Sequence, residues 1–135
     1  MEEKNCLQSE KQIQFFHGSH EDIPGMTKHL LTLYESGMQF HGVIAADDSL
    51  ALSAVKFAKA IGIQVPQDLS VIGFNNSLLV HCCDPELTSI DNKLETLCQH
   101  LITTLMGVLG GNEMPKETIF SGELIRRGTS HPKQN

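Results

Sequence analysis

Three clusters of polar residues could together hold a small molecule that carries many hydroxyl groups. They are the loop from His17 to Asp22, the pair Asp47-Asp48 and the pair Asn75-Asn76. Carboxylates accept charge-assisted hydrogen bonds, often two at a time, and amides both donate and accept. The chemistry that these residue types predict is recognition by hydrogen bonding.

A fourth cluster, His81-Cys82-Cys83-Asp84, has residue types that bind zinc, and Cys98 and His100 follow it. Structural zinc sites take their ligands from two closely spaced pairs, and this spacing does not occur here. Cysteine is also commonly a small buried apolar residue. We therefore expect neither a bound metal nor another cofactor.

Each of the first three polar clusters follows a run of residues typical of a strand. These runs are residues 12–16 (QIQFF), 41–46 (HGVIAA) and 69–74 (LSVIGF), which are short and rich in aromatic or β-branched side chains. Two helices are predicted between them, over about 24–37 and 48–62. There apolar residues recur at helical spacing and a glycine stands at the end.

Strands that alternate with helices pair in parallel and have right-handed connections. The chain is therefore predicted to form an α/β fold with a parallel, doubly wound sheet. In such sheets, ligands bind beyond the carboxyl ends of the strands. The three polar clusters should meet at one rim of the sheet, and this convergence is the strongest functional signal in the sequence.

The last third of the chain follows a different pattern. Residues 87–90 (LTSI) are a brief extended piece, after which Asp91 or Asn92 could cap a long helix with leucines on one side. Glycines at 110–111 end this helix, and residues 116–126 predict one or two last strands.

Composition excludes several classes of function for this segment. The formal charge of −6 and the absence of any basic run longer than Arg126-Arg127 argue against direct DNA binding. No stretch is apolar enough for a membrane span or a signal peptide. The four cysteines match no secreted disulfide framework, so we expect a reducing cytoplasm.

Four motifs, in order, resemble the lactose-repressor family of transcription regulators. GVIAADDSLALSAV begins at Gly42, GIQVPQDLSVIGFNN at Gly62, PELTSI at Pro85 and ELIRRGTS at Glu123. The family has Asn-Asp at the end of the first motif's strand and Asp-Asp at the end of the second. Here the pairs are Asp-Asp and Asn-Asn, a combination that looks like some maltose-type regulators. The resemblance covers most of the chain, from about Phe16 onward.

The resemblance implies a periplasmic-binding-protein-like sensor whose two α/β lobes grip a sugar or a similar polar metabolite. It also implies a homodimer and an N-terminal helix-turn-helix for DNA, which this chain does not show. Residues 12–130 would form most of the C-terminal lobe, truncated at its start, with a crossover to the other lobe from about 87–92. We expect residues 1–11 and 131–135 to be disordered.

The resemblance also suggests roles for the polar residues at the rim. Asp47 would accept hydrogen bonds from ligand hydroxyls, while Asp48 would cap the helix and fix the loop; alternatively, both only cap the helix. Asn75 would orient a sugar or close the strand in an Asx-type turn. Asn76 would support the same loop.

Two further ligand candidates come from the resemblance. His20 falls where relatives often carry an aromatic that stacks on the ligand, although an exposed histidine without a role is an equal alternative. Asn92 lies at the crossover, where it either reaches the cleft or caps the next helix. The subunit interface of the family suggests Leu50, Leu78, Leu79 and Val80 as dimer contacts, with core packing as the alternative.

Two other functions remain open from the sequence. The chain could be a protein-interaction module that responds to a phosphocarrier corepressor, as in some members of the family. It could also be an enzyme on a doubly wound sheet, with Asp47 or Asp48 as acid or base. No glycine-rich phosphate loop and no nucleophile motif supports an enzyme, so we expect a sensor.

Overall fold

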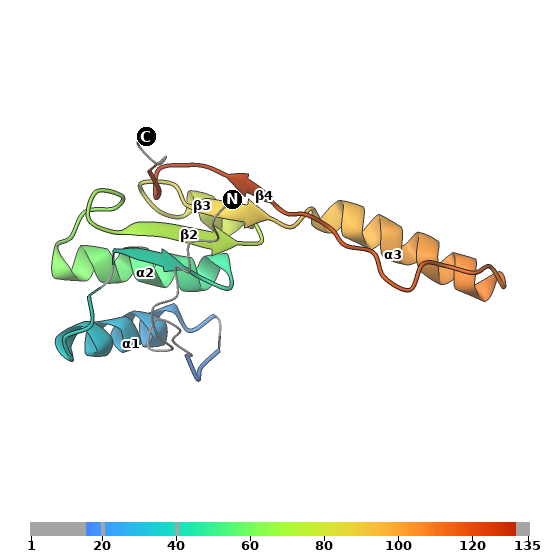
Figure 1. Ribbon diagram of the computed structural model, residues 1–135. Helices are drawn as coiled ribbons and strands as arrows, with labels where there is room; N and C mark the ends of the chain where they lie inside the picture. Colours follow the sequence, from blue (N-terminus) through green and yellow to red (C-terminus); the bar gives the residue numbers. More distant parts are fainter. Residues whose placement is uncertain (1–15, 20, 40, 132–135) are drawn as a thin grey trace, which may run out of the picture.

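The computed structural model describes residues 16–19, 21–39 and 41–131 (Figure 1). Four strands form one sheet in the order β1-β2-β3-β4. The strands are β1 (Gly42–Ile44), β2 (Ser70–Phe74), β3 (Thr88–Asp91) and β4 (Glu123–Ile125). The helices are α1 (Ile23–Glu35), α2 (Asp48–Ile61), the short 3-10 helix η2 (Leu78–His81) and α3 (Leu94–Leu109).

The sheet is parallel except at its last strand. β1 pairs with β2 and β2 with β3 in parallel, whereas β4 runs antiparallel to β3. The predicted α/β fold is therefore confirmed, with a sheet that is mostly parallel. The stretch 116–126 contains only the three-residue strand β4. The strand predicted over 12–16 falls almost wholly outside the described residues, and Phe16 belongs to no strand.

The core lies between the sheet and α2, and α1 packs against the other side of α2 (Figure 1). α2 ends where sequence predicted, because Gly62 adopts the left-handed conformation (φ 76°) that a helix C-cap favours. Apolar side chains from α2, β2, η2 and the residues just before β2 and β3 fill the space. The largest of these fully buried side chains are Phe57, Leu69, Val71, Val80 and Leu87.

α3 is different, because none of its residues is buried. Together with the segment that returns beside it, α3 forms an arm that projects from the sheet (Figure 1). His100 of α3 contacts this returning segment, at Thr118 Oγ1 (3.2 Å) and at the ring of Phe120. Seven large apolar side chains of α3 are more than half exposed: Leu94, Leu101, Ile102, Leu105, Met106, Val108 and Leu109.

The predicted cap of α3 is wrong. The N-cap residue is Lys93, in a left-handed conformation (φ 53°), and no side chain caps the helix. Asp91 Oδ1 accepts a hydrogen bond from Lys93 N (2.8 Å), which holds the turn before the helix. Asn92 turns toward Asn75 instead of capping.

Within the described residues, no helix combines the length and the apolar character that a membrane crossing requires.

Candidate ligand-binding site

The carboxyl ends of β1, β2 and β3 lie at one level of the sheet, and each has a polar residue at or just beyond it. Ile44 pairs with Ile72, and Ile72 pairs with Thr88. Each of these three residues is followed, three positions later, by a polar residue: Asp47, Asn75 and Asp91. The structure therefore brings together the ends that carry Asp47 and Asn75. We call this level, with the loops that continue from it, the rim.

Two other segments lie toward this end of the molecule. The described parts of the loop before α1, residues 17–19 and 21–22, lie at the same end of the molecule as the carboxyl ends of the strands (Figure 1). The arm also leaves the sheet at this end, directly after β3. His20, a predicted ligand residue, lies outside the described residues.

Asp47 is the N-cap of α2, and this corrects the prediction that Asp48 caps the helix. Asp47 has the extended backbone of an N-cap residue, and its Oδ1 accepts hydrogen bonds from Leu50 N (2.8 Å) and Ser49 Oγ (2.7 Å). Helix capping, which was the alternative to ligand binding for Asp47, is therefore a role that Asp47 has. Its position at the rim is compatible with a second role toward a ligand.

Asp48 instead holds the loops of the rim together from beneath. Its side chain is buried, and its Oδ2 accepts a hydrogen bond from Ser77 N (2.6 Å), at the start of η2. Its Oδ1 accepts one from Ser89 Oγ of β3 (2.5 Å). Gly73 makes room for this carboxylate, since a Cβ there would lie 2.3 Å from Asp48 Oδ1. Asp48 thus supports the loop, as predicted, without capping the helix.

The Asn75-Asn76 turn has an unusual backbone and is heavily hydrogen-bonded. Both residues have positive φ (93° and 46°), which asparagine tolerates better than most residues. Asn75 N donates to Ile90 O (2.9 Å), and Asn75 Oδ1 accepts from Asn92 Nδ2 (2.9 Å). Asn75 and Asn92 are therefore neighbours at the exposed rim.

Asn76 points inward, toward groups that the sequence interpretation missed. Its Oδ1 accepts from Arg127 Nη2 (2.8 Å), its Nδ2 donates to Asp91 Oδ2 (3.3 Å) and its backbone N donates to Ser89 Oγ (3.0 Å). Asp91 was predicted only as a cap. Its place at the end of a third strand was the signal that could have revealed it, whereas nothing in the sequence distinguished Arg127 from Arg126.

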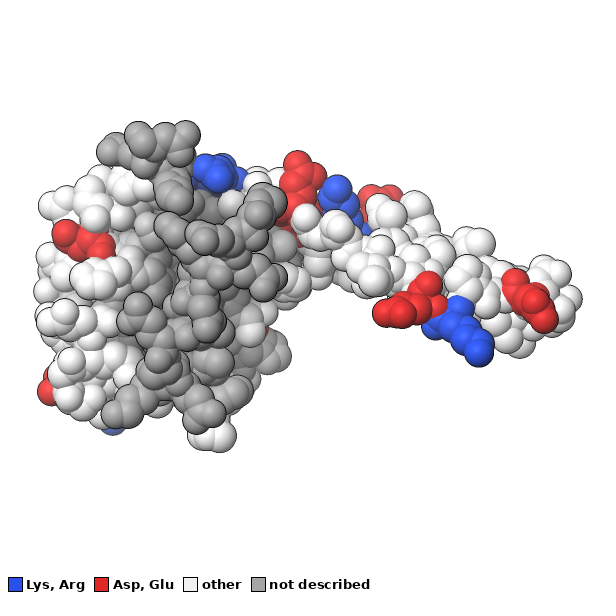
Figure 2. Space-filling view, viewed as in Figure 1, with Lys and Arg blue, Asp and Glu red and all other residues white. Residues whose placement is uncertain are grey.

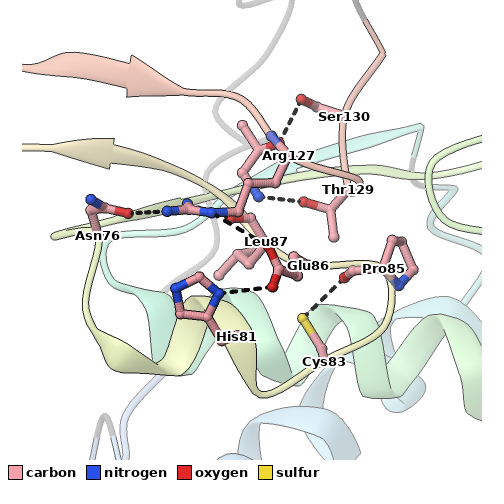
Figure 3. A network of polar contacts seen from close by, with 10 residues as sticks. Asn76, His81, Cys83, Pro85, Glu86, Leu87, Arg127, Thr129 and Ser130 are labelled. Carbon is pink, nitrogen blue, oxygen red and sulfur yellow. Dashed lines mark hydrogen bonds and ion pairs between the residues drawn. The ribbon is translucent and has the colours of Figure 1, made fainter.

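The cysteine cluster does not form a metal site. Within the part of the chain that the structure describes, no group of three or more histidine, cysteine or acidic side chains is arranged to hold a metal ion. Burial is the main cause that raises the pKa of the Cys83 thiol, and Cys82, Asp84 and Glu86 raise it further. Cys83 Sγ instead lies 3.2 Å from Pro85 O, to which it donates (Figure 3).

The predicted dimer contacts divide into one buried and three accessible residues. Val80 is 1% exposed and belongs to the core, so its prediction as an interface residue is wrong. The 3-10 turn of η2 directs it inward, against α2 and the sheet. Leu78, in contrast, is 87% exposed, and Leu50 and Leu79 are partly exposed.

The distribution of charged side chains can be followed on one face of the described residues. On the face seen in Figure 2, the described lysine and arginine side chains lie singly or beside acidic ones and form no continuous basic patch. This agrees with the net charge of −6. The polar residues named at the rim, Asp47, Asn75, Asp91 and Asn92, carry carboxylates and amides, which suit an uncharged polar ligand.

A family model described as a periplasmic binding protein-like domain matches residues 17–130. The chain belongs to this family. Its resemblance to the lactose-repressor type of regulator, and the fold which that implies, are confirmed. A transcriptional regulator of the helix-turn-helix type from Lachnoclostridium phytofermentans is 54% identical over 106 residues, which is 78% of this chain and 32% of the relative.

Two further relatives are more distant. The regulator MalR of Streptomyces coelicolor is 36% identical over 95 residues, 70% of this chain and 28% of MalR. The crystal structure of a sugar-binding transcriptional regulator of the LacI family from Escherichia coli, complexed with phosphate, superposes with a TM-score of 0.70. It is 30% identical, and the match covers 79% of this chain and 38% of that one. The chain thus spans about a third of these relatives, which are regulators rather than enzymes.

Proposed function

We propose that this chain is the ligand-sensing lobe of a sugar-responsive transcription regulator. The observation that carries the proposal is the rim, where Asp47, Asn75 and Asp91 stand at or just beyond the carboxyl ends of three adjacent parallel strands. Ligands of open α/β sheets bind beyond such strand ends. The sugar-binding regulator of Escherichia coli, which is 30% identical, supports a sugar as the ligand.

In this proposal, the residues at the rim have complementary roles. Asp47 accepts hydrogen bonds from sugar hydroxyls with the carboxylate capacity that its capping bonds leave free. Asn75 and Asn92, which are linked to each other, present amide groups that both donate and accept. His20 is an additional candidate for stacking against the sugar ring. Asp48 and Asn76 hold these residues in place from inside the lobe.

The exposed apolar face of the arm is an argument for a second lobe on the other side of the rim. α3 leaves the sheet at the carboxyl ends of the strands and carries seven apolar side chains that the described residues leave exposed. Burial of such a face is strongly favourable, at about 25 cal/mol per Å². We infer that α3 belongs to the other lobe of the sensor, which covers this face and forms the opposite wall of the ligand cleft.

The whole regulator is proposed to be a cytoplasmic homodimer that binds DNA through a separate helix-turn-helix. Leu78, which is 87% exposed, and the partly exposed Leu50 and Leu79 are the proposed subunit contacts. The ligand would act by binding one arrangement of the lobes more tightly than the other. Sedimentation measurements of the oligomeric state test the contact.

A sugar titration followed by NMR tests the proposed function on this chain. With one wall of the cleft absent, affinity should be weak, in the millimolar range. Adding maltose, glucose or cellobiose to ¹⁵N-labelled protein should shift the amide signals of Asp47, Asn75 and Asn92. The amide of Asp68, in a turn remote from the rim, serves as the internal control. The proposal fails if none of the three sugars moves a rim signal more than that of Asp68.

A further inference from the structure

Arg127 lies beneath the rim, at the point where the chain leaves β4 (Figure 3). Its side chain is 15% exposed. Nη1 donates to Leu87 O (3.0 Å) and Nη2 donates to Asn76 Oδ1 (2.8 Å). The carboxylate of Glu86 is more remote, with 3.9 Å between its Oε2 and Arg127 Nε. The two short bonds of the guanidinium therefore go to neutral oxygens, one of which is on the Asn75-Asn76 turn.

The bond from Arg127 determines which way the Asn76 amide faces. With Oδ1 directed at the guanidinium, Nδ2 faces the carboxylate of Asp91, to which it donates. A flipped amide would place its NH₂ group against the cationic guanidinium and its oxygen against the carboxylate. Both contacts would then be repulsive, so Arg127 and Asp91 together permit one orientation.

The orientation of Asn76 matters for Asn75 because the two residues are consecutive and both left-handed. Such conformations are costly and persist where surrounding contacts determine them. Asn76 is pinned by its side chain and by its backbone N–H to Ser89 Oγ. Asn75 is then left with its side chain at the exposed rim, against Asn92.

Arg127 can be altered at its side chain without detaching its backbone. Its backbone N donates to Thr88 Oγ1 (2.9 Å), a bond that does not involve the guanidinium. Thr129 fixes the next part of the chain, since its Oγ1 donates to Val71 O and accepts from Thr88 N, both at 2.8 Å. A substitution that keeps the charge and the apolar stem should therefore leave the fold intact.

We propose that Arg127 is a positioning residue for the candidate binding site. Its planar guanidinium reaches Leu87 O and Asn76 Oδ1 at the same time and so fixes the turn that presents Asn75 at the rim. Lysine would provide the charge but not the fork, because an ammonium group is a compact point charge. The role in binding rests on the proposed function, but the role in orienting the turn does not.

The orienting role can be measured without a ligand, from the side-chain NH₂ signals of Asn75 and Asn76 in ¹⁵N-labelled protein. We expect Arg127→Lys to move both pairs of signals and to speed the hydrogen exchange of the Asn76 NH₂ group. Arg126→Lys is the matched control, because Arg126 is the exposed neighbour and the charge is again unchanged. In an Asn76→Ala background, Arg127→Lys should no longer move the Asn75 signals.

The inference is overturned if Arg127→Lys leaves both NH₂ pairs where Arg126→Lys leaves them. It is also overturned if the Asn75 signals move equally with and without the Asn76 side chain, since the effect would then not pass through Asn76. Should Arg127→Lys fail to fold, Asn76→Ala alone must displace the Asn75 signals; unchanged signals would reject the inference.

A maltose titration of the same variants gives the consequence for binding. Arg127→Lys should weaken the apparent affinity roughly ten-fold, the effect of losing about one charge-assisted hydrogen bond. Arg126→Lys should bind as the wild type does. If the wild type binds no sugar while the NMR signals of Asn75 and Asn76 respond as described, the proposed function fails and the orienting role of Arg127 stands.

Discussion

Asp48→Asn should destabilise the fold far more than Asp47→Asn, although the two substitutions change the charge equally. Asp48 is a buried carboxylate with two short hydrogen bonds, to Ser77 N and Ser89 Oγ. Asparagine keeps the shape but replaces one acceptor oxygen with a donor. The bond from Ser77 N then falls from charged to neutral strength, because the amide oxygen carries no full charge. The Ser89 hydroxyl would have to accept from the new NH₂ group instead of donating. We therefore expect a loss of about 2–4 kcal/mol in the free energy of unfolding.

Asp47→Asn provides the control, since asparagine is as good an N-cap as aspartate. Its expected effect is within about 0.5 kcal/mol of the wild type. Urea unfolding followed by far-UV circular dichroism measures both variants, because the chain has no tryptophan for fluorescence. Equal losses in the two variants, or a loss below about 0.5 kcal/mol for Asp48→Asn, would refute the assignment of roles.

Three further outcomes follow from burial and packing. Gly73→Ala should lower the free energy of unfolding by about 1–3 kcal/mol, because its Cβ meets the Asp48 carboxylate; an unchanged urea midpoint would contradict this. Leu78→Asp should reduce self-association in sedimentation without loss of stability, whereas Val80→Ala should cost about 1–3 kcal/mol; the reverse pattern would exclude the η2 contact. At about pH 8, iodoacetamide should alkylate Cys83 more slowly than exposed Cys82, because the raised pKa of Cys83 keeps its thiol protonated. Equal rates by mass spectrometry would count against this.

Much of the lobe could be predicted from local patterns. Apolar residues at helical spacing located α1 and α2, and Gly62 marked the end of α2 because its left-handed backbone suits glycine. The β-branched run before Asn75 gave β2 and its place in the core. The rim could be predicted because the carboxyl ends of parallel strands necessarily meet at one edge of the sheet.

The roles of individual residues depended on tertiary contacts that local rules do not contain. Either aspartate of the pair could have capped α2; the difference is that Gly73, on a neighbouring strand, leaves room for the Asp48 carboxylate. Asn92 looked like a cap, yet Asn75 lies close enough to bind its amide. Periodicity predicted the apolar side of α3 but not that the described residues leave it uncovered.

The connection between the arm and the sheet limits how the arm can move. β3 and β4 are adjacent, and their last paired residues are Asp91 and Glu123. The chain enters the arm just after this rung, through the left-handed Lys93, and returns just before it at Gly122, whose Cα hydrogens face Ile90 and Asp91 at close range. The two segments that join the arm to the sheet therefore lie side by side. Changes in the angle of the arm are therefore confined to the few backbone bonds of these two segments, which the Lys93–Glu123 ion pair (3.4 Å) and the bond from Lys93 N to Asp91 Oδ1 (2.8 Å) join to the sheet.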